Sequence, residues 1–106
     1  MMKFLLVACG SYNPIHNMHL RMFELVRDSL KKKFHEKSLK NSDFQGLISA
    51  TSDAYKKKGL QPFETRAKLI EISTKSSNWI NLSRMEGERS VWTPTAKVLE
   101  ELNDLF

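Results

Sequence analysis

The feature that most constrains the fold is a short, uninterrupted apolar run near the N-terminus, residues 4–9 (FLLVAC), which ends at Gly10. A run of this length is typical of a β-strand covered on both faces, as in a parallel sheet. We therefore expect a strand over residues 3–9, with helices on both sides of it. The run is much shorter than the roughly 20 apolar residues that span a bilayer, so we expect no membrane partner.

The rest of the chain alternates between helical and strand patterns. Apolar residues recur every three or four positions over residues 18–33, which predicts an amphipathic helix. Short strands are expected over residues 46–50 and 79–83, and further helices, each opening near a proline, over residues 62–75 and 93–106. The order βαβαβα predicts an α/β fold, with a Rossmann-like parallel sheet and right-handed crossovers.

The same periodicity predicts which side chains pack. On the last two helices the expected buried faces are Phe63, Ala67, Ile70 and Thr74, and Ala96, Leu99, Leu102 and Phe106. We interpret Trp79 as a packing residue of the third strand, and Arg66 as a surface residue of the second helix.

Charge and cysteine content narrow the partners and the compartment. The 17 Lys and Arg outnumber the 12 Asp and Glu, and lysines cluster at residues 31–33 and 56–58, so we expect an anionic partner. Phosphorylated small molecules and nucleic acid both fit, but no zinc-finger spacing or RNA-recognition motif points to a specific nucleic acid. The single cysteine, Cys9, forms no internal disulfide, which favours a reducing, intracellular compartment.

The most informative stretch is residues 9–19, CGSYNPIHNMH, which joins the first strand to the first helix. Open α/β sheets bind ligands at this junction. Gly10 lets phosphate oxygens approach the backbone, and Ser11 adds a hydroxyl. His16 and His19 stand three apart at a helix N-terminus, where both rings can donate toward an anion. The alternatives are a metal half-site or two surface histidines without function, and neither a Walker A loop nor a dinucleotide fingerprint is present.

Residues 10–21, GSYNPIHNMHLR, resemble the signature of the nucleotidylyltransferase superfamily, G-[ST]-F-[DN]-P-[IV]-[HT]-x-x-H. Residues 18–25 (MHLRMFEL), 52–60 (SDAYKKKGL) and 91–99 (VWTPTAKVL) resemble the eukaryotic nicotinamide/nicotinic acid mononucleotide adenylyltransferases. The similarity also runs through residues 69–79, so it covers nearly all of the chain.

This resemblance implies roles for the first motif. Gly10 and Ser11 would present backbone and hydroxyl groups to the phosphates of the mononucleotide and of ATP, with Tyr12 beside them. His16 and His19 would be the paired phosphate-binding positions, of which His19 matters more. His16 stands where the eukaryotic enzymes often have threonine and the bacterial ones histidine.

Four more residues match family positions further along the chain. Tyr55 and Lys57 match the loop that meets the mononucleotide and the ATP phosphates; without the resemblance, this lysine run would be interpreted as a solvated cluster or a nuclear-localisation patch. Trp92 matches the tryptophan on which the pyridine ring stacks, and Thr95 matches a position that helps to hold the carboxamide. A tryptophan ahead of a helix cap is otherwise equally typical of packing.

The reaction that the resemblance implies is adenylyl transfer from ATP to nicotinamide mononucleotide or nicotinic acid mononucleotide. It gives NAD or deamido-NAD and pyrophosphate, in NAD biosynthesis. His19, His16 and Lys57 would be the catalytic residues, and Mg²⁺ would be carried mainly by the ATP phosphates, with no residue of the chain as a metal ligand. The full-length enzyme would be a homo-oligomer in the nucleus or cytoplasm.

The family's second phosphate motif, I-S-S-T-[KR], and its G-[AS]-D segment are not recognisable in the sequence. A half-sheet would also leave the apolar first strand at an edge. We therefore expect residues 1–106 to be the N-terminal part of a single nucleotidylyltransferase domain, truncated before the C-terminal phosphate motif. Two alternatives stay open: an inactive truncated form or interaction module that keeps part of the mononucleotide pocket, and a basic nucleic-acid-binding module.

Overall fold

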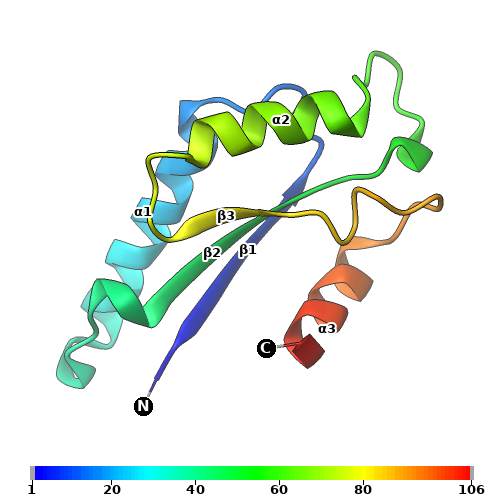
Figure 1. The fold of residues 1–106 in the computed structure, drawn as a ribbon. Coiled ribbons are helices and arrows are strands. Elements are labelled where there is room, and N and C mark those ends of the chain that lie inside the picture. The colour runs from blue at the N-terminus through cyan, green and yellow to red at the C-terminus, as the bar shows by residue number, and fades with distance from the viewer. Residues whose placement is uncertain (1, 106) are drawn as a thin grey trace.

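Parallel strands form the sheet of this chain, in the order β1-β2-β3 (Figure 1). In the computed structural model, which describes residues 2–105, these strands are Phe4–Gly10, Phe44–Ala50 and Ile80–Ser83. β1 pairs with β2 from Phe4 opposite Phe44 to Gly10 opposite Ala50, so the two strands end side by side. The predicted α/β fold with a parallel sheet is confirmed.

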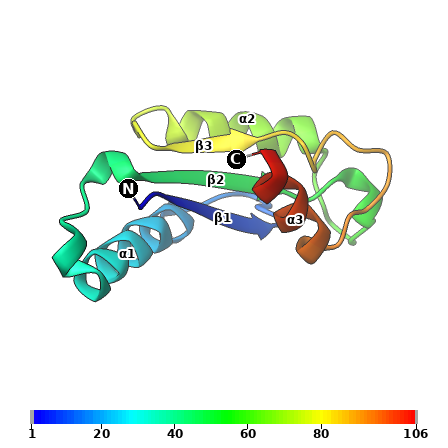
Figure 2. The ribbon, with the colours of Figure 1, turned by 90° about the horizontal axis from the view of Figure 1, so that it is seen from below.

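The helices cover both faces of the sheet. They are α1 (Asn17–Lys33), α2 (Phe63–Thr74) and α3 (Thr95–Leu105). Side chains of α1 and α2 pack with Ile48 in one core cluster, whereas Val98 and Leu102 of α3 pack with Leu47 in another. Successive residues of a strand point to opposite faces, so α3 lies on the opposite face of the sheet from α1 and α2 (Figure 2).

β2, rather than β1, is the most buried strand among the described residues. Six of the seven residues of β2 are buried, while every residue of β1 is half-buried. Both faces of β1 are nevertheless covered, as expected, because Leu6 and Ala8 pack in the first core cluster and Leu5 and Val7 in the second. β1 is less buried than β2 because it pairs with β2 alone in this sheet and lies at its edge.

The predicted helix faces are confirmed for α2 and only in part elsewhere. Phe63, Ala67, Ile70 and Thr74 are all buried. On α3 the prediction is confirmed for Leu102, which is buried one turn from Val98, and is wrong for Ala96 and Leu99, which are exposed; Phe106 lies outside the described residues. On α1 only Phe23 is buried, and Met18, Met22 and Val26 are exposed.

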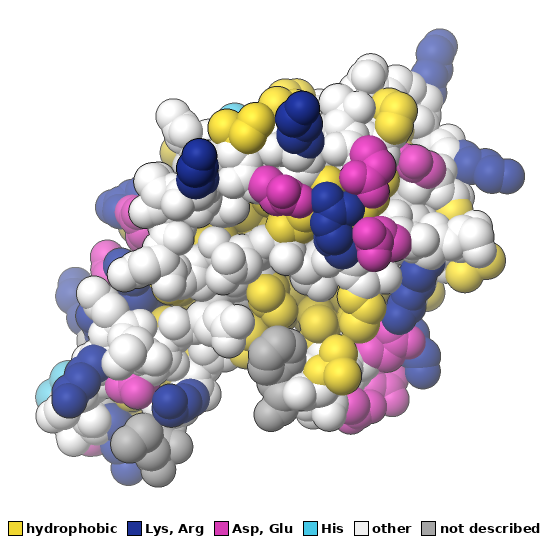
Figure 3. Space-filling model, in the orientation of Figure 1, with side chains coloured by type: hydrophobic (Ala, Val, Ile, Leu, Met, Phe, Trp, Pro, Cys, Tyr) yellow, Lys and Arg dark blue, Asp and Glu magenta, His cyan; other side chains and the backbone are white. Residues whose placement is uncertain are grey.

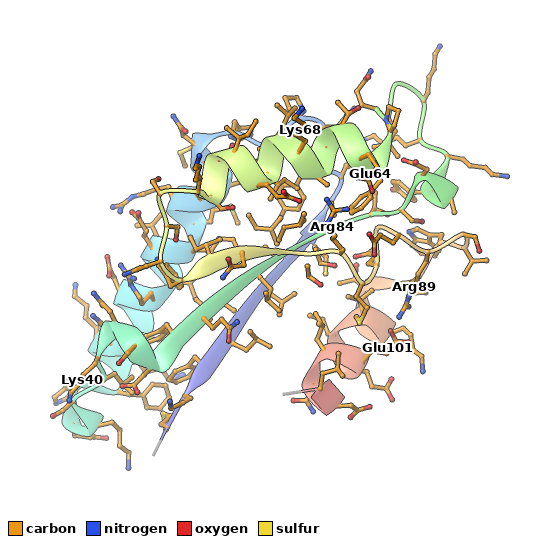
Figure 4. All side chains as sticks on the ribbon, viewed as in Figure 1. Lys40, Glu64, Lys68, Arg84, Arg89 and Glu101 are labelled. Atoms are coloured by element: carbon orange, nitrogen blue, oxygen red, sulfur yellow. The ribbon has the colours of Figure 1, made fainter. Side chains whose placement is uncertain are left out.

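Arg84, directly after β3, joins this strand to α2 on the surface. Its guanidinium pairs with Glu64 of α2 at 3.0 Å (Figure 4). It also pairs with Glu71 of α2 at 2.7 Å and with Glu88 at 3.3 Å. Exposed pairs of this kind contribute at most about 1 kcal/mol each, so their main consequence is to fix where the chain runs after β3.

On the α3 face, hydrophobic side chains line a hollow beside the sheet (Figure 3). Its walls include Leu5 and Val7 of β1 and Leu99 and Leu102 of α3. None of the helices within residues 2–105 is long and apolar enough to cross a membrane.

Candidate functional site

The candidate site lies where β1 and β2 end. The Thr51 amide donates to the Gly10 carbonyl at 2.9 Å, which holds the two strand ends together. A side chain on Gly10 would place its Cβ only 3.3 Å from the Tyr12 ring, so glycine lets this ring lie close to the strand end. Tyr12 itself has a φ of 48°, in the left-handed region that non-glycine residues rarely adopt. The loop after β1 is thus a specifically shaped turn.

Tyr12 is buried at this turn. Its hydroxyl donates to the Ala8 carbonyl at 2.9 Å, and burial, with smaller effects from Cys9 and Glu86, raises the pKa of Tyr12 to about 12. The phenol therefore stays protonated at neutral pH. The Tyr12 side chain thus links the turn to β1 through Ala8, and its ring packs edge-on against His19, with centroids 4.8 Å apart.

His16 and His19 form a stacked pair at the start of α1. Their ring centroids are 3.8 Å apart, and the His16 amide donates to His19 Nδ1 at 3.0 Å. Because Nδ1 accepts this bond, a neutral His19 carries its proton on Nε2. Burial, and then the neighbouring His16, lowers the pKa of His19, which favours this neutral form. His19 can therefore donate from Nε2.

Two cavities share Cys9, Gly10 and Ser11 in their walls. The first, the Trp92 cavity, has a volume of about 140 Å³, and its other walls are Thr51, Tyr55, Glu86, Trp92 and Thr95. The second, the His19 cavity, has a volume of about 170 Å³ and is lined also by Ala8, Tyr12, His19 and Met22. The turn after β1 thus stands between an aromatic cavity and a histidine cavity.

The sequence-predicted residues sort into three groups around these cavities. Tyr55, Trp92 and Thr95 come together in the Trp92 cavity with Gly10 and Ser11, and Tyr55 stacks on Trp92 with centroids 5.9 Å apart. Tyr12 and His19 line the other cavity, and His16 stacks on His19.

Two further residues that the sequence analysis singled out lie outside the cavities. Lys57 is exposed in the loop after β2 and lines neither cavity. Trp79 packs against Phe23 and beneath Arg27, as its interpretation as a packing residue predicted.

Side chains of the first loop and of α2 hold the lysine loop in place. Asn13 donates to the Gly59 carbonyl at 2.9 Å and accepts from the Gln61 amide at 3.0 Å. Asp53 accepts from the Phe63 amide at 2.8 Å and from Arg66 at 3.0 Å. Both ends of the segment that carries Lys57 are therefore fixed to the rest of the site.

The comparisons with known proteins identify the family of this chain. The family model described as cytidylyltransferase-like matches residues 7–104. The chain belongs to this cytidylyltransferase-like family. The matched span includes each sequence-predicted site residue from Gly10 to Thr95.

Curated relatives of this cytidylyltransferase-like chain carry one kind of name. A Bos taurus protein named nicotinamide/nicotinic acid mononucleotide adenylyltransferase 1 is 46% identical over 97 residues, which is 92% of this chain and 33% of the relative. An Arabidopsis thaliana protein named nicotinamide/nicotinic acid mononucleotide adenylyltransferase is 42% identical over 92% of the chain and 38% of its own length. A Drosophila melanogaster protein named nicotinamide-nucleotide adenylyltransferase is 38% identical over 89% of the chain and 23% of its own length. The chain thus spans between 23% and 38% of the length of these relatives.

The expectation that Arg66 lies at the surface is wrong, because this arginine is buried and joins the two loops of the candidate site. Its side chain is 1% exposed. It donates to the carbonyls of Gln61 at 2.7 Å, Ser11 at 2.9 Å and Thr51 at 2.8 Å, as well as to Asp53. A signal was available, because Arg66 stands three residues after Phe63 and four before Ile70, on the apolar face of α2.

Glu86 is the second residue that sequence reasoning missed. It follows β3, is 4% exposed and lines the Trp92 cavity. Ser49 donates to its Oε1 at 2.8 Å, and burial raises the pKa of the carboxyl group despite this hydrogen bond and the positive charges of Arg89 and Arg66. No spacing in the sequence indicates the contact, which joins residues 37 positions apart.

Proposed function

We propose that this chain carries the part of an adenylyltransferase that binds the mononucleotide and the ATP phosphates. The enzyme would transfer AMP from ATP to nicotinamide or nicotinic acid mononucleotide, giving NAD or deamido-NAD and pyrophosphate. The observation that carries the proposal is the pair of cavities that share Gly10 and Ser11, one walled by Trp92 and one by His19. The names of the curated relatives support the same reaction.

The proposed substrates fit the chemistry of the two cavities. A pyridine ring can stack on Trp92, which is 49% exposed and so offers a face, in the cavity that Thr95 also lines. Phosphates would meet the turn at Gly10 and Ser11 and the start of α1, where free amides and the helix dipole favour an anion. The tyrosine of the loop after β2, Tyr55, would exchange its stacking on Trp92 for contact with the mononucleotide.

The chemical step would need no general base. A 5′-phosphate oxygen of the mononucleotide is already anionic near neutral pH and attacks the α-phosphorus of ATP, and the bond from that phosphorus to the oxygen bridging to the β-phosphorus breaks. His19 would donate from Nε2 to an α-phosphate oxygen, with His16 beside it, while Lys57 would follow the departing pyrophosphate as a mobile charge. Catalysis would thus consist of alignment and neutralisation of charge.

We propose Mg²⁺ as the metal that enters with ATP. Residues 2–105 contain no group of three or more His, Cys, Asp or Glu side chains placed to hold a metal ion. A magnesium ion that enters with ATP would be bound mainly through the substrate phosphates. The expected homo-oligomer and the nuclear or cytoplasmic location stay predictions.

Pyrophosphate release from ATP and nicotinamide mononucleotide tests the proposal in the intact protein. We expect His19→Ala to lower kcat by orders of magnitude with a smaller effect on mononucleotide affinity. The control is His35→Ala, because His35 is exposed beyond the far end of α1 and should leave kcat unchanged. A near-wild-type rate for His19→Ala would overturn the assignment.

The same assay on the 106-residue chain alone distinguishes an enzyme from a binding module. Mononucleotide binding without pyrophosphate release would assign this chain a binding role only. Tight binding to DNA or RNA that weakens steeply with salt would favour the basic nucleic-acid-binding module instead.

A further inference from the structure

Glu86 is a buried carboxylate that the proposed mechanism does not use. Its side chain is 4% exposed, and the Ser49 hydroxyl donates to one carboxylate oxygen, Oε1, at 2.8 Å. Within residues 2–105 this is the single hydrogen bond that the carboxylate accepts. A carboxylate has room for about four such bonds, so most of its accepting capacity is free.

Two arginines, Arg89 and Arg66, act on Glu86 through their positive charge, and each forms an ion pair with another carboxylate. Arg66 pairs with Asp53 at 3.0 Å. Arg89 pairs with Glu101 on α3 and donates to Thr93 at 3.1 Å (Figure 4). Neither guanidinium donates to Glu86, so among the described residues its charge has no direct cationic partner. Leaving a buried charge in this state is costly, which points to a ligand that uses it.

Glu86 also lies in a wall of the Trp92 cavity, together with Trp92 and Thr95. At about 140 Å³ this cavity is small, so a group that stacks on Trp92 brings its neighbouring atoms close to Glu86. A phosphate cannot be that neighbour, because two negative charges would repel each other there. A hydrogen-bond donor is the chemistry that fits the carboxylate.

We propose that Glu86 binds the nucleoside half of the mononucleotide by accepting a hydrogen bond from it. This inference rests on the proposed function. It orients the substrate, with the nucleoside toward Glu86 and the 5′-phosphate toward the His19 cavity. Two donors of the nucleoside share the required chemistry: the carboxamide N–H of nicotinamide mononucleotide and a ribose hydroxyl.

Glu86→Gln tests this inference, because it keeps the shape of the side chain, can still accept from Ser49 and removes the charge. In steady-state kinetics on the intact protein, we expect the KM for nicotinamide mononucleotide to rise about 10-fold or more, since hydrogen bonds to charged groups are the stronger ones. The KM for ATP should stay within about twofold, because the proposal places Glu86 at the nucleoside and the phosphates toward the His19 cavity. The control is Glu88→Gln, an exposed carboxylate two residues away whose loss should change neither KM.

Nicotinic acid mononucleotide separates the two donors. A KM increase confined to nicotinamide mononucleotide assigns the bond to the carboxamide, and an equal increase for both mononucleotides assigns it to a ribose hydroxyl. A mononucleotide KM within threefold of wild type, or an equal rise in the KM for ATP, would overturn the inference. Wild-type protein that releases no pyrophosphate with either mononucleotide would instead overturn the proposed function.

Ser49→Ala provides a second variant in case Glu86→Gln does not fold. It leaves the carboxylate in place and removes only the hydroxyl that orients it. We expect a smaller rise in the mononucleotide KM, of about threefold, again without a change for ATP. An unchanged mononucleotide KM would contradict the inference.

Discussion

Arg66 and Ser11 are joined by a hydrogen bond across 55 positions of the sequence, from Arg66 Nη1 to the Ser11 carbonyl at 2.9 Å. The same nitrogen donates to the Thr51 carbonyl at 2.8 Å. One buried guanidinium therefore fixes the turn after β1 relative to the loop after β2. These are the segments that carry the proposed phosphate-binding residues Ser11 and Lys57.

Replacing Arg66 by lysine should loosen both segments. Lysine keeps the charge but cannot reproduce the planar fork, so buried carbonyls lose their donors. We expect Arg66→Lys to lower the free energy of unfolding by about 3 kcal/mol and to reduce kcat/KM for both substrates. Urea unfolding of the intact protein, followed by circular dichroism, measures the first effect. Lys68→Ala, exposed on the same helix, is the control, and equal stability of the two variants would contradict the prediction.

The burial of Arg66 shows where sequence reasoning was limited. The apolar period on α2 correctly predicted Phe63, Ala67, Ile70 and Thr74 as buried. The same period places Arg66 beside Ala67, but an arginine on a buried face is rare unless it is paired. Its carbonyl partners come from two loops, Ser11 after β1 and Thr51 and Gln61 at opposite ends of the loop after β2, and no local pattern in the sequence shows that they converge.

Lys57 differs from its two lysine neighbours in the role that we propose for it. All three of Lys56, Lys57 and Lys58 are exposed, so their removal should not affect folding. We expect Lys57→Ala to lower kcat for pyrophosphate release at least 10-fold, because a charge that follows the leaving group is lost from the transition state. Lys58→Ala should lower kcat by less than about twofold, since a solvated charge contributes little. Equal rates in the two variants would identify the run as a solvated cluster.

The two tryptophans offer a matched pair for separating binding from packing. Trp92 is half exposed in its cavity, whereas Trp79 packs edge-on against Phe23, with centroids 6.0 Å apart. We expect Trp92→Ala to raise the mononucleotide KM by about 5- to 100-fold, since stacking on an aromatic side chain is worth about 1–3 kcal/mol. Its melting temperature should change little.

Trp79→Ala should show the opposite pattern. The loss of a packed aromatic destabilises by about 3 kcal/mol or more, with the mononucleotide KM unchanged. Differential scanning fluorimetry and steady-state kinetics on the same preparations measure both effects. A Trp92 variant that unfolds early without a KM effect would assign that residue to packing.

How much of the site could be predicted depended on distance along the chain. Gly10, Ser11, His16 and His19 lie at one strand-to-helix junction, so their spacing alone indicated that they come together, whereas Tyr12 was reached through resemblance. Trp92 and Thr95 were reached through resemblance, and the cavity that unites them with Gly10 depends on how the chain runs after β3. The contact of Ser49 with Glu86 depends on the same path, which Arg84 fixes through its acidic partners on α2.

Glu86 should lower the stability of the fold at neutral pH. Burial raises the pKa of its carboxyl group above the ordinary 4.5, so at a pH between that value and the folded-state pKa the folded protein holds a proton that the unfolded chain has released. Its contribution to stability is therefore fully present below pH 4.5 and is lost as the pH rises through the folded-state pKa.

The Glu86→Gln variant tests this prediction, because its amide does not titrate and so does not lose stability in this way. The free energy of unfolding of the variant, relative to wild type, should accordingly increase as the pH is raised from 4.5 to 8, as urea titrations at several pH values would measure. The control is Glu88→Gln, which should show no such trend because the Glu88 carboxylate is exposed.

A Glu86→Gln variant that is more stable at neutral pH yet binds the mononucleotide less well would show that the charge is kept for binding at the expense of stability. A stability difference that stays constant with pH would mean that burial leaves the carboxyl group unperturbed.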